Sequence, residues 1–504
     1  MTPRSLRALA CAVMIMLAGG PRALAADGLA EGRVRIETGR LQGEVRENAV
    51  VFRNIPFAAP PVGPLRWAPP QRAPAWDDLR DARQLGPSCP QPMRPDGRPN
   101  FGGANGGASE DCLQLNVFAP PKARRAPVMV WLHGGAHRYG AGWIYDGSSF
   151  ARDGVVLVSI NYRLGPLGAF AHPALTREAG TSNPLGNYGL MDQLAALEWV
   201  QRNIAAFGGD PGNVTLFGES AGAMSTLVLI TLPQAKGLFH KAIVQSGAGF
   251  GPSRGLQDME AQGARLAAQL GLPADPAPSV LRSVPVEALV EASEEGTWSP
   301  FVDGRLVVEA PAQAFAAGRE LEVPLIIGSN SGEDSLMAGA GAAAAPARLR
   351  ALYPGLDDEA AARAMFTDRV MGAPARWIAR QAADGAPSWL YYFNYVGSRF
   401  RPGTRTAAHA AEIQYVFEYW GRRTDPATIT PSDRDMASLM HGCWTSFAKT
   451  SQPKCPQGVA WPEFDARTQT LLEFSDVSGP RPGFRAPQLD AHEAMALRRL
   501  GLAQ

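Results

Sequence analysis

Short runs of apolar residues, each too brief for a helix, constrain the fold of this chain more than any other feature. They lie at residues 117–118, 128–132, 155–160, 214–217, 242–245, 323–327 and 390–393. Continuous apolar runs of this length suit strands that are buried on both faces. Between them, residues 192–206 place Leu194, Leu197 and Val200 on one face at helical spacing. Alternating strands and helices predict an α/β fold with a large, mostly parallel central sheet flanked by helices.

Two stretches, 255–322 and 335–410, are Ala-rich and more helical in pattern. We expect them to be helical insertions over the carboxyl edge of the sheet, where ligands and catalytic groups of open parallel sheets collect. No internal repeat or linker marks a boundary, so residues 26–504 are expected to form a single domain.

The first residues have the pattern of a targeting segment. Arg4 and Arg7 precede an apolar stretch at 8–18, and Ala23-Leu24-Ala25 matches a small-x-small cleavage site. The alternative is a buried N-terminal helix. We expect residues 1–25 to be a signal peptide cleaved near Ala25, and the mature protein to be secreted or periplasmic.

Four cysteines remain in the mature chain, an even number that indicates disulfides in an exported protein. Proximity in sequence favours the pairs Cys89–Cys112 and Cys443–Cys455. The alternative is buried free thiols, above all for Cys443 on its expected helix. No CxxC or paired-histidine spacing accompanies them, which argues against a zinc site.

A nucleophile is predicted at Gly218-Glu219-Ser220-Ala221-Gly222. This pattern follows the apolar run 214–217 and precedes a helical run at 221–229. It is the strand–turn–helix arrangement in which a serine hydroxyl projects from a tight turn. The flanking glycines leave room for the neighbouring backbone, and the helix N-terminus directs free N–H groups toward Ser220.

A serine hydroxyl needs a base, and the base needs an orienting acid. His409 is the best base, because it lies in a loop-like stretch beyond the candidate acids. His441 fits a core or surface helix position, and His492 is expected to be solvated in the charged terminal segment. The acid is expected at Glu333, shortly after the run 323–327, with adjacent Asp334 as the alternative.

The oxyanion hole should consist of backbone N–H groups. Ala221 supplies one, and the His133-Gly134-Gly135-Ala136 stretch after run 128–132 can supply the rest. We expect His133 to stabilise this loop and not to act as a base.

Charge and hydropathy exclude several kinds of partner. The chain has 48 basic against 47 acidic residues, a net charge of +1, and no basic run or phosphate-binding Gly-Lys loop. Nucleic acid and anionic membranes are therefore not expected partners. After the signal peptide no apolar stretch is long enough to span a bilayer.

Together these residues resemble the type-B carboxylesterase/lipase family, which includes the cholinesterases. Similar stretches lie at 52–67, 109–119, 158–170 and 186–222, with islands at 328–333 and 409–417. The resemblance implies an α/β-hydrolase fold with Ser220, Glu333 and His409 as nucleophile, acid and base. It also implies oxyanion groups at Gly135, Ala136 and Ala221, the Cys89–Cys112 disulfide, a small-molecule ester substrate, and no cofactor or metal.

The resemblance has one departure that bears on substrate. Cholinesterases place a choline-stacking tryptophan inside the first disulfide loop, whereas this loop contains Phe101 and no tryptophan, so choline esters are not expected substrates. The expected activity is carboxylic ester hydrolysis. Alternatives are a lipase, a feruloyl-type, polyester- or amide-cleaving enzyme, or a non-catalytic adhesion domain of the same superfamily.

Overall fold

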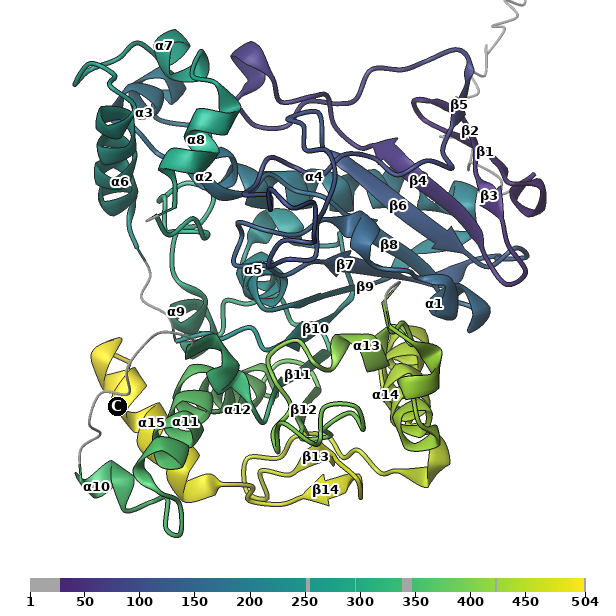
Figure 1. The fold of residues 1–504 in the computed structure, drawn as a ribbon, viewed down its shortest axis with the longest axis vertical. Helices are drawn as coiled ribbons and strands as arrows, with labels where there is room; N and C mark the ends of the chain where they lie inside the picture. Colours follow the sequence, from purple (N-terminus) through teal and green to yellow (C-terminus); the bar gives the residue numbers. More distant parts are fainter. Residues whose placement is uncertain (1–27, 251–253, 295, 338–346, 422–423, 503–504) are drawn as a thin grey trace, which may run out of the picture.

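The computed structural model describes residues 28–250, 254–294, 296–337, 347–421 and 424–502 (Figure 1). The predicted signal peptide at 1–25 lies outside these residues. Within them, a large sheet contains eleven strands in the order β14-β13-β12-β11-β10-β9-β7-β8-β6-β4-β3. The strands are β3 (Glu44–Val45), β4 (Val50–Pro56), β6 (Gln114–Ala119), β7 (Ala126–Leu132), β8 (Val156–Ile160), β9 (Gly209–Glu219), β10 (Lys241–Gln245), β11 (Leu325–Asn330), β12 (Ser388–Phe393), β13 (Leu471–Phe474) and β14 (Gly479–Arg481).

The centre of this sheet is parallel and its edges are antiparallel. Strands β8, β7, β9, β10, β11, β12 and β13 pair in parallel, whereas β6, β4 and β3 on one side and β14 on the other pair antiparallel. The predicted mostly parallel sheet is therefore confirmed. Every predicted apolar run overlaps one of these strands, although the runs 155–160 and 323–327 begin one and two residues before β8 and β11.

Side chains of successive residues in a strand enter two separate cores. Val128, Val130 and Leu132 of β7 belong to one hydrophobic cluster, and Met129 and Trp131 belong to the other. The first cluster is covered by α4 (Tyr188–Asn203), α5 (Ala221–Ile230) and α12 (Ala373–Ala382), and the second by α1 (Ser148–Arg152), α13 (Ile413–Val416) and α14 (Pro431–Thr450). The strands are buried on both faces, which explains why their sequences are continuously apolar.

The two predicted insertions differ in content. The described part of 255–322 contains α6 (Leu256–Gln269), α7 (Pro278–Arg282), α8 (Val286–Ala292) and α9 (Pro311–Ala316). The stretch 335–410 contains α10 (Ala347–Arg350), α11 (Asp358–Thr367) and α12, but also β12 of the central sheet. A purely helical description of 335–410 is therefore wrong, because the run at 390–393 is a sheet strand.

The N-terminal part of the described chain contains strands that the sequence did not predict, because many prolines interrupt its pattern. A separate three-stranded sheet is formed by β1 (Arg33–Ile36), β2 (Gly39–Gln42) and β5 (Leu79–Asp81). The remaining α-helices of the described residues are α2 (Gly165–Gly168), α3 (Pro173–Ala179) and α15 (Ala486–Arg499). Among the described residues no helix has the length and apolar character needed to cross a membrane.

Both predicted disulfides are present. Cys89–Cys112 lies before β6, and Cys443–Cys455 joins α14 to the segment that follows it.

Candidate active site

Ser220 lies at a tight turn between β9 and α5. Its φ of 54° and ψ of −121° put a non-glycine residue in an uncommon conformation. A Cβ on Gly222 would overlap the backbone carbonyl of Leu132, and one on Gly218 would lie 2.6 Å from the Gly222 carbonyl carbon. The glycines thus allow β7, β9 and α5 to meet at the serine. The predicted strand–turn–helix arrangement is present, with Ser220 half-buried at its apex.

The loop after β7 runs toward the same turn. Gly135, Ala136 and His137 have φ values of 104°, 56° and 55°. Three successive residues with positive φ fold the loop tightly, and Ala136 tolerates the conformation despite its Cβ. The Tyr162 hydroxyl donates to the His133 carbonyl at 2.5 Å, and the His133 ring stacks on Tyr162.

His133 is buried and holds this loop. Burial lowers the pKa of His133 to about 4, so the ring is neutral near pH 7. Its Nδ1 lies 2.8 Å from the carbonyl oxygen of Gly134. These contacts agree with the loop-stabilising role expected for His133.

The structure brings Glu333 and His409 together. The His409 Nδ1 lies 2.6 Å from Glu333 Oε2, and Glu333 is fully buried. The other carboxylate oxygen accepts the Ser246 hydroxyl at 2.6 Å and the Asn330 backbone N–H at 2.8 Å. The two chain segments are joined by the Gly332 N–H, which donates to the Ala407 carbonyl at 2.7 Å, one residue before Glu333 and two residues before His409.

A second carboxylate, Glu219, faces the other nitrogen of His409. The His409 Nε2 and Glu219 Oε1 are 3.0 Å apart, yet neither atom forms a hydrogen bond within the described part of the chain. Glu219 directly precedes Ser220 in the chain. The predicted contact between His409 and Ser220 itself stays a prediction.

The carboxylates determine the charge state of His409. Burial alone would lower the pKa of His409, but the charge of Glu219, the hydrogen bond to Glu333 and more distant Glu412 raise it to about 10. Burial, opposed by His409 and aided by Glu412 and Glu333, raises the pKa of Glu219 to about 8. The imidazole therefore holds its proton more tightly than a free histidine does.

A third carboxylate, that of Glu412, acts on His409 and is fully buried. Gln245 donates to its Oε1 at 2.9 Å, and Asn330 donates to its Oε2 at 2.6 Å. Asn330 also donates to the Ala408 carbonyl at 2.9 Å, so Glu412 fixes the backbone next to His409. Burial is the main reason that the pKa of Glu412 is raised.

The alternative acid and bases lie elsewhere. Asp334 pairs with Arg363 at 3.1 Å and does not bind His409. His441 is buried in α14, between the Val416 carbonyl and Asp153. The expectation that His492 is solvated is wrong: the side chain is buried in α15, with Nε2 2.9 Å from the Tyr353 hydroxyl. Its charged segment forms an amphipathic helix whose buried face includes His492.

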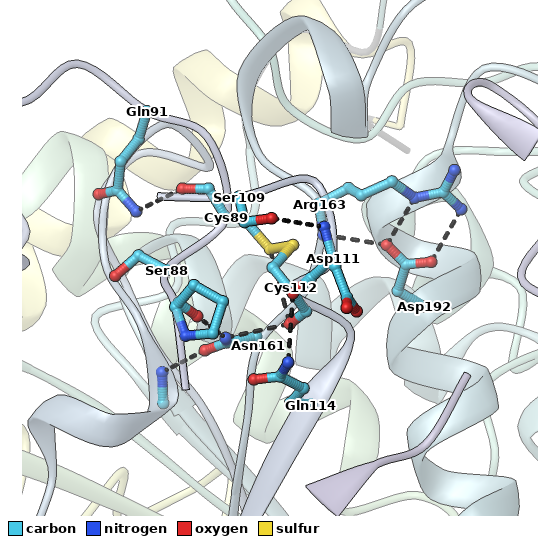
Figure 2. Close-up of a disulfide and its surroundings, with 12 residues drawn as sticks. Ser88, Cys89, Gln91, Ser109, Asp111, Cys112, Gln114, Asn161, Arg163 and Asp192 are labelled. Atoms are coloured by element: carbon cyan, nitrogen blue, oxygen red, sulfur yellow. Dashed lines mark hydrogen bonds and ion pairs between the residues drawn. A yellow bond between two sulfur atoms is a disulfide. The ribbon is translucent and has the colours of Figure 1, made fainter. Parts of the chain in front are cut away.

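The first disulfide supports the loop that contains Gly135. Gln91, two residues after Cys89, donates to the Gly140 carbonyl at 2.8 Å and accepts the Gly140 N–H at 2.8 Å. On the other side of the disulfide, Asn161 donates to the Cys112 carbonyl at 3.1 Å (Figure 2). The disulfide segment thus holds the end of the loop that begins at His133.

Sequence reasoning missed Glu219 and Glu412 as parts of this site. Glu219 was visible inside the glycine-flanked pattern, and Glu412 follows His409 by three residues. Nothing in either neighbourhood indicates burial, because both carboxylates are enclosed by segments distant in sequence. In the described ranges no group of three or more His, Cys, Asp or Glu side chains is arranged to hold a metal ion.

Comparisons with known proteins identify the family of this chain. The Carboxylesterase family model matches residues 30–349 and 357–489. The chain is 34% identical to the para-nitrobenzyl esterase of Bacillus subtilis (strain 168), over 88% of this chain and 95% of that protein. It is 34% identical to the fumonisin B1 esterase of Sphingopyxis macrogoltabida, over 88% and 86%.

Solved structures give the same result. A para-nitrobenzyl esterase structure aligns with a TM-score of 0.79 and 32% identity, covering 91% of this chain and 99% of that one. A match of this extent and identity assigns both the α/β-hydrolase fold and an esterase activity. The chain belongs to the type-B carboxylesterase family and is a carboxylesterase.

Proposed function

We propose that this carboxylesterase works through a covalent acyl-enzyme on Ser220, with His409 as base and Glu333 as the acid that orients it. The observation that carries the proposal is the 2.6 Å contact between Glu333 and His409 Nδ1, which leaves Nε2 facing Glu219, the residue before Ser220. Gly135, Ala136 and Ala221 are proposed as the N–H donors of the oxyanion hole.

The reaction then proceeds in two acyl transfers. His409 Nε2 takes the Ser220 proton as the serine oxygen bonds to the ester carbonyl carbon, and the three N–H groups stabilise the resulting oxyanion. When the C–O bond to the alcohol breaks, His409 gives that proton to the alcohol oxygen. Water attacks the acyl-enzyme next, losing a proton to His409, which returns it to Ser220 as the acid leaves.

An activity-based probe tests the nucleophile. A fluorophosphonate probe should label the protein with one-to-one stoichiometry, and peptide mass spectrometry should place the label on Ser220. Pretreatment with a substrate-like ester inhibitor should block it. Labelling on another serine, or none in a preparation that hydrolyses esters, would contradict the assignment.

The pH dependence of kcat/KM should reflect the raised pKa of His409. Because the base acts only when unprotonated, kcat/KM should rise with pH on the alkaline side of 6.5, the usual histidine value. Glu219→Gln removes the carboxylate whose charge raises the pKa of His409 most, and should therefore shift the rising limb to lower pH. Asp334→Asn is the control, since Asp334 pairs with Arg363. An unshifted limb in Glu219→Gln would refute this role of Glu219.

The two disulfides should differ in their effect on activity. Removing either pair by Cys→Ser substitution should cost about 3 kcal/mol of unfolding free energy by chain entropy. Only loss of Cys89–Cys112 should also lower kcat/KM under conditions where the protein stays folded, because Gln91 holds Gly140. Equal kcat/KM in the two double variants would show that the disulfide segment does not support the loop.

Export is part of the proposal. Residues 1–25 are proposed as the signal peptide, and the two disulfides support folding in an oxidising compartment, either extracellular or periplasmic.

A further inference from the structure

A cavity of about 520 Å³ lies against His409. Its walls come from the segment between β12 and α13, from α13 and the residues after it, and from Ile144 and Tyr145. Six aromatic side chains line it: Tyr145, Tyr395, Phe400, Tyr415, Tyr419 and Trp420. A volume of this size is in the range of small-molecule sites, which run from about 300 to 1,000 Å³.

The described lining carries no carboxylate, ammonium or guanidinium group. The nearby guanidinium groups lie over aromatic rings, with Arg399 Cζ 4.6 Å from the Phe400 ring centroid and Arg401 Cζ 5.3 Å from that of Tyr395. These ring faces are thus already occupied by positive charge. A cationic ligand would find no counter-ion in the described lining, whereas an uncharged ring would bury apolar surface.

A second, smaller cavity of about 100 Å³ has a different lining. It is lined by Met224, one helical turn after Ser220 on α5, by Gly247 and Gly249 after β10, and by Phe301. His409 is absent from its described lining. The two cavities therefore differ both in size and in their contact with the histidine.

We propose that the larger cavity binds the alcohol part of the substrate, and that the natural substrates are esters of small acids with bulky, uncharged aromatic or alicyclic alcohols. This inference depends on the proposed function, in which His409 protonates the leaving alcohol oxygen. That oxygen must then lie beside His409, which places the alcohol group at the cavity containing His409 and leaves the smaller cavity for the acyl group.

Two ester series separate the cavities. One keeps the acetyl group and enlarges the alcohol (ethyl, benzyl and naphthylmethyl acetate), and the other keeps ethanol and enlarges the acid (ethyl acetate, benzoate and naphthoate). Val396→Trp, which places a larger side chain in the large cavity, should lower kcat/KM for naphthylmethyl acetate by about tenfold or more, and that for ethyl acetate by a smaller factor. Met224→Trp, in the small cavity, should instead lower kcat/KM for the esters with the larger acids.

The outcomes are distinct. If Val396→Trp lowered kcat/KM mainly for the esters with larger acids, or equally for both series, the assignment of the alcohol group to the large cavity would be overturned. In the unaltered protein, 3,3-dimethylbutyl acetate should exceed its cationic isostere acetylcholine in kcat/KM, and the reverse would overturn the preference for uncharged alcohols. Failure of the unaltered protein to hydrolyse even ethyl acetate and p-nitrophenyl acetate would instead refute the proposed function.

A separate observation concerns His137, which connects the two elements expected to form the oxyanion hole. Its Nε2 lies 3.0 Å from the Ser225 hydroxyl on α5, which also accepts from Gln193 at 3.1 Å, and all three side chains are buried. Burial, then the nearby His133, lowers the pKa of His137 to about 3 against an opposing hydrogen bond with the Ala221 backbone. His137 directly follows Ala136 in the chain, and its neutral ring contacts α5, the helix that begins at Ala221.

We infer that His137 is a positioning residue that fixes the distance between the N–H groups of Gly135 and Ala136 and that of Ala221. His137→Phe should lower kcat by about tenfold to a hundredfold with little change in KM, because misplaced donors weaken the transition state selectively. A trifluoromethyl ketone, which forms an oxyanion adduct, should lose affinity in parallel. His137→Gln, which keeps a polar group near Ser225, should recover part of both losses. A lower Tm with unchanged kcat and ketone affinity would mean a structural role only.

Discussion

Ser220→Ala is expected to lower kcat for ester hydrolysis by about 10⁴-fold or more, because the nucleophile and its covalent intermediate are both lost. The fold should persist. Ser220 is half-buried at the end of β9, and alanine meets the same conformational cost at a φ of 54°. Steady-state kinetics with p-nitrophenyl acetate, together with thermal unfolding of the same samples, measure both effects.

A matched control separates loss of the nucleophile from a general effect of removing a serine. Ser293 is buried more deeply than Ser220, and its hydroxyl donates to the carbonyl of Val290 at the end of α8. Ser293→Ala should keep its activity. Substantial turnover by Ser220→Ala that a fluorophosphonate still blocks would place the nucleophile elsewhere.

Asp192→Asn is expected to destabilise the folded protein by about 3–5 kcal/mol, because it leaves a buried guanidinium without its counter-ion. The Arg163 and Asp192 side chains are 3% and 0% exposed, and two guanidinium nitrogens donate to the carboxylate, each at 2.8 Å (Figure 2). Asp192 also accepts the backbone N–H of Arg163 at 2.9 Å. Urea unfolding monitored by tryptophan fluorescence measures the difference.

The surface pair Arg125–Asp210 provides the control. Arg125 is 83% exposed, so Asp210→Asn should change the unfolding free energy by about 1 kcal/mol or less. Similar losses in the two variants would mean that Arg163 reaches water when its partner is removed.

The central sheet could be predicted because β7 to β12 are buried on both faces, which makes their sequences continuously apolar. The edge and N-terminal strands could not. β1 alternates exposed and buried residues over four positions, and β14 is three residues long and contains a proline. Such segments become strands only because a neighbouring strand pairs with them, and that neighbour is distant in the chain.

Some residues of the candidate site could likewise be predicted from the sequence, and others could not. Ser220 and His409 could be located from local pattern and chain order, but Glu333 and Asp334 differ by one position and are chemically alike. Their difference is tertiary: one is enclosed with Ser246 and Asn330, and the other pairs with exposed Arg363. The burial of His492 could not be predicted for the same reason, because it depends on Tyr353, a residue distant in sequence that packs against α15.

The pairing of Gly332 with Ala407 has a consequence for the order of events during folding. The groups around the imidazole come from β9, β10, β11 and the segment after β12, and these strands are parallel neighbours joined by long crossovers. Parallel pairing of such distant segments is a slow, late process. A nascent or fragmentary chain can therefore contain a well-formed turn at Ser220 long before it can catalyse anything, and the emergence of turnover reports completion of the sheet out to β12.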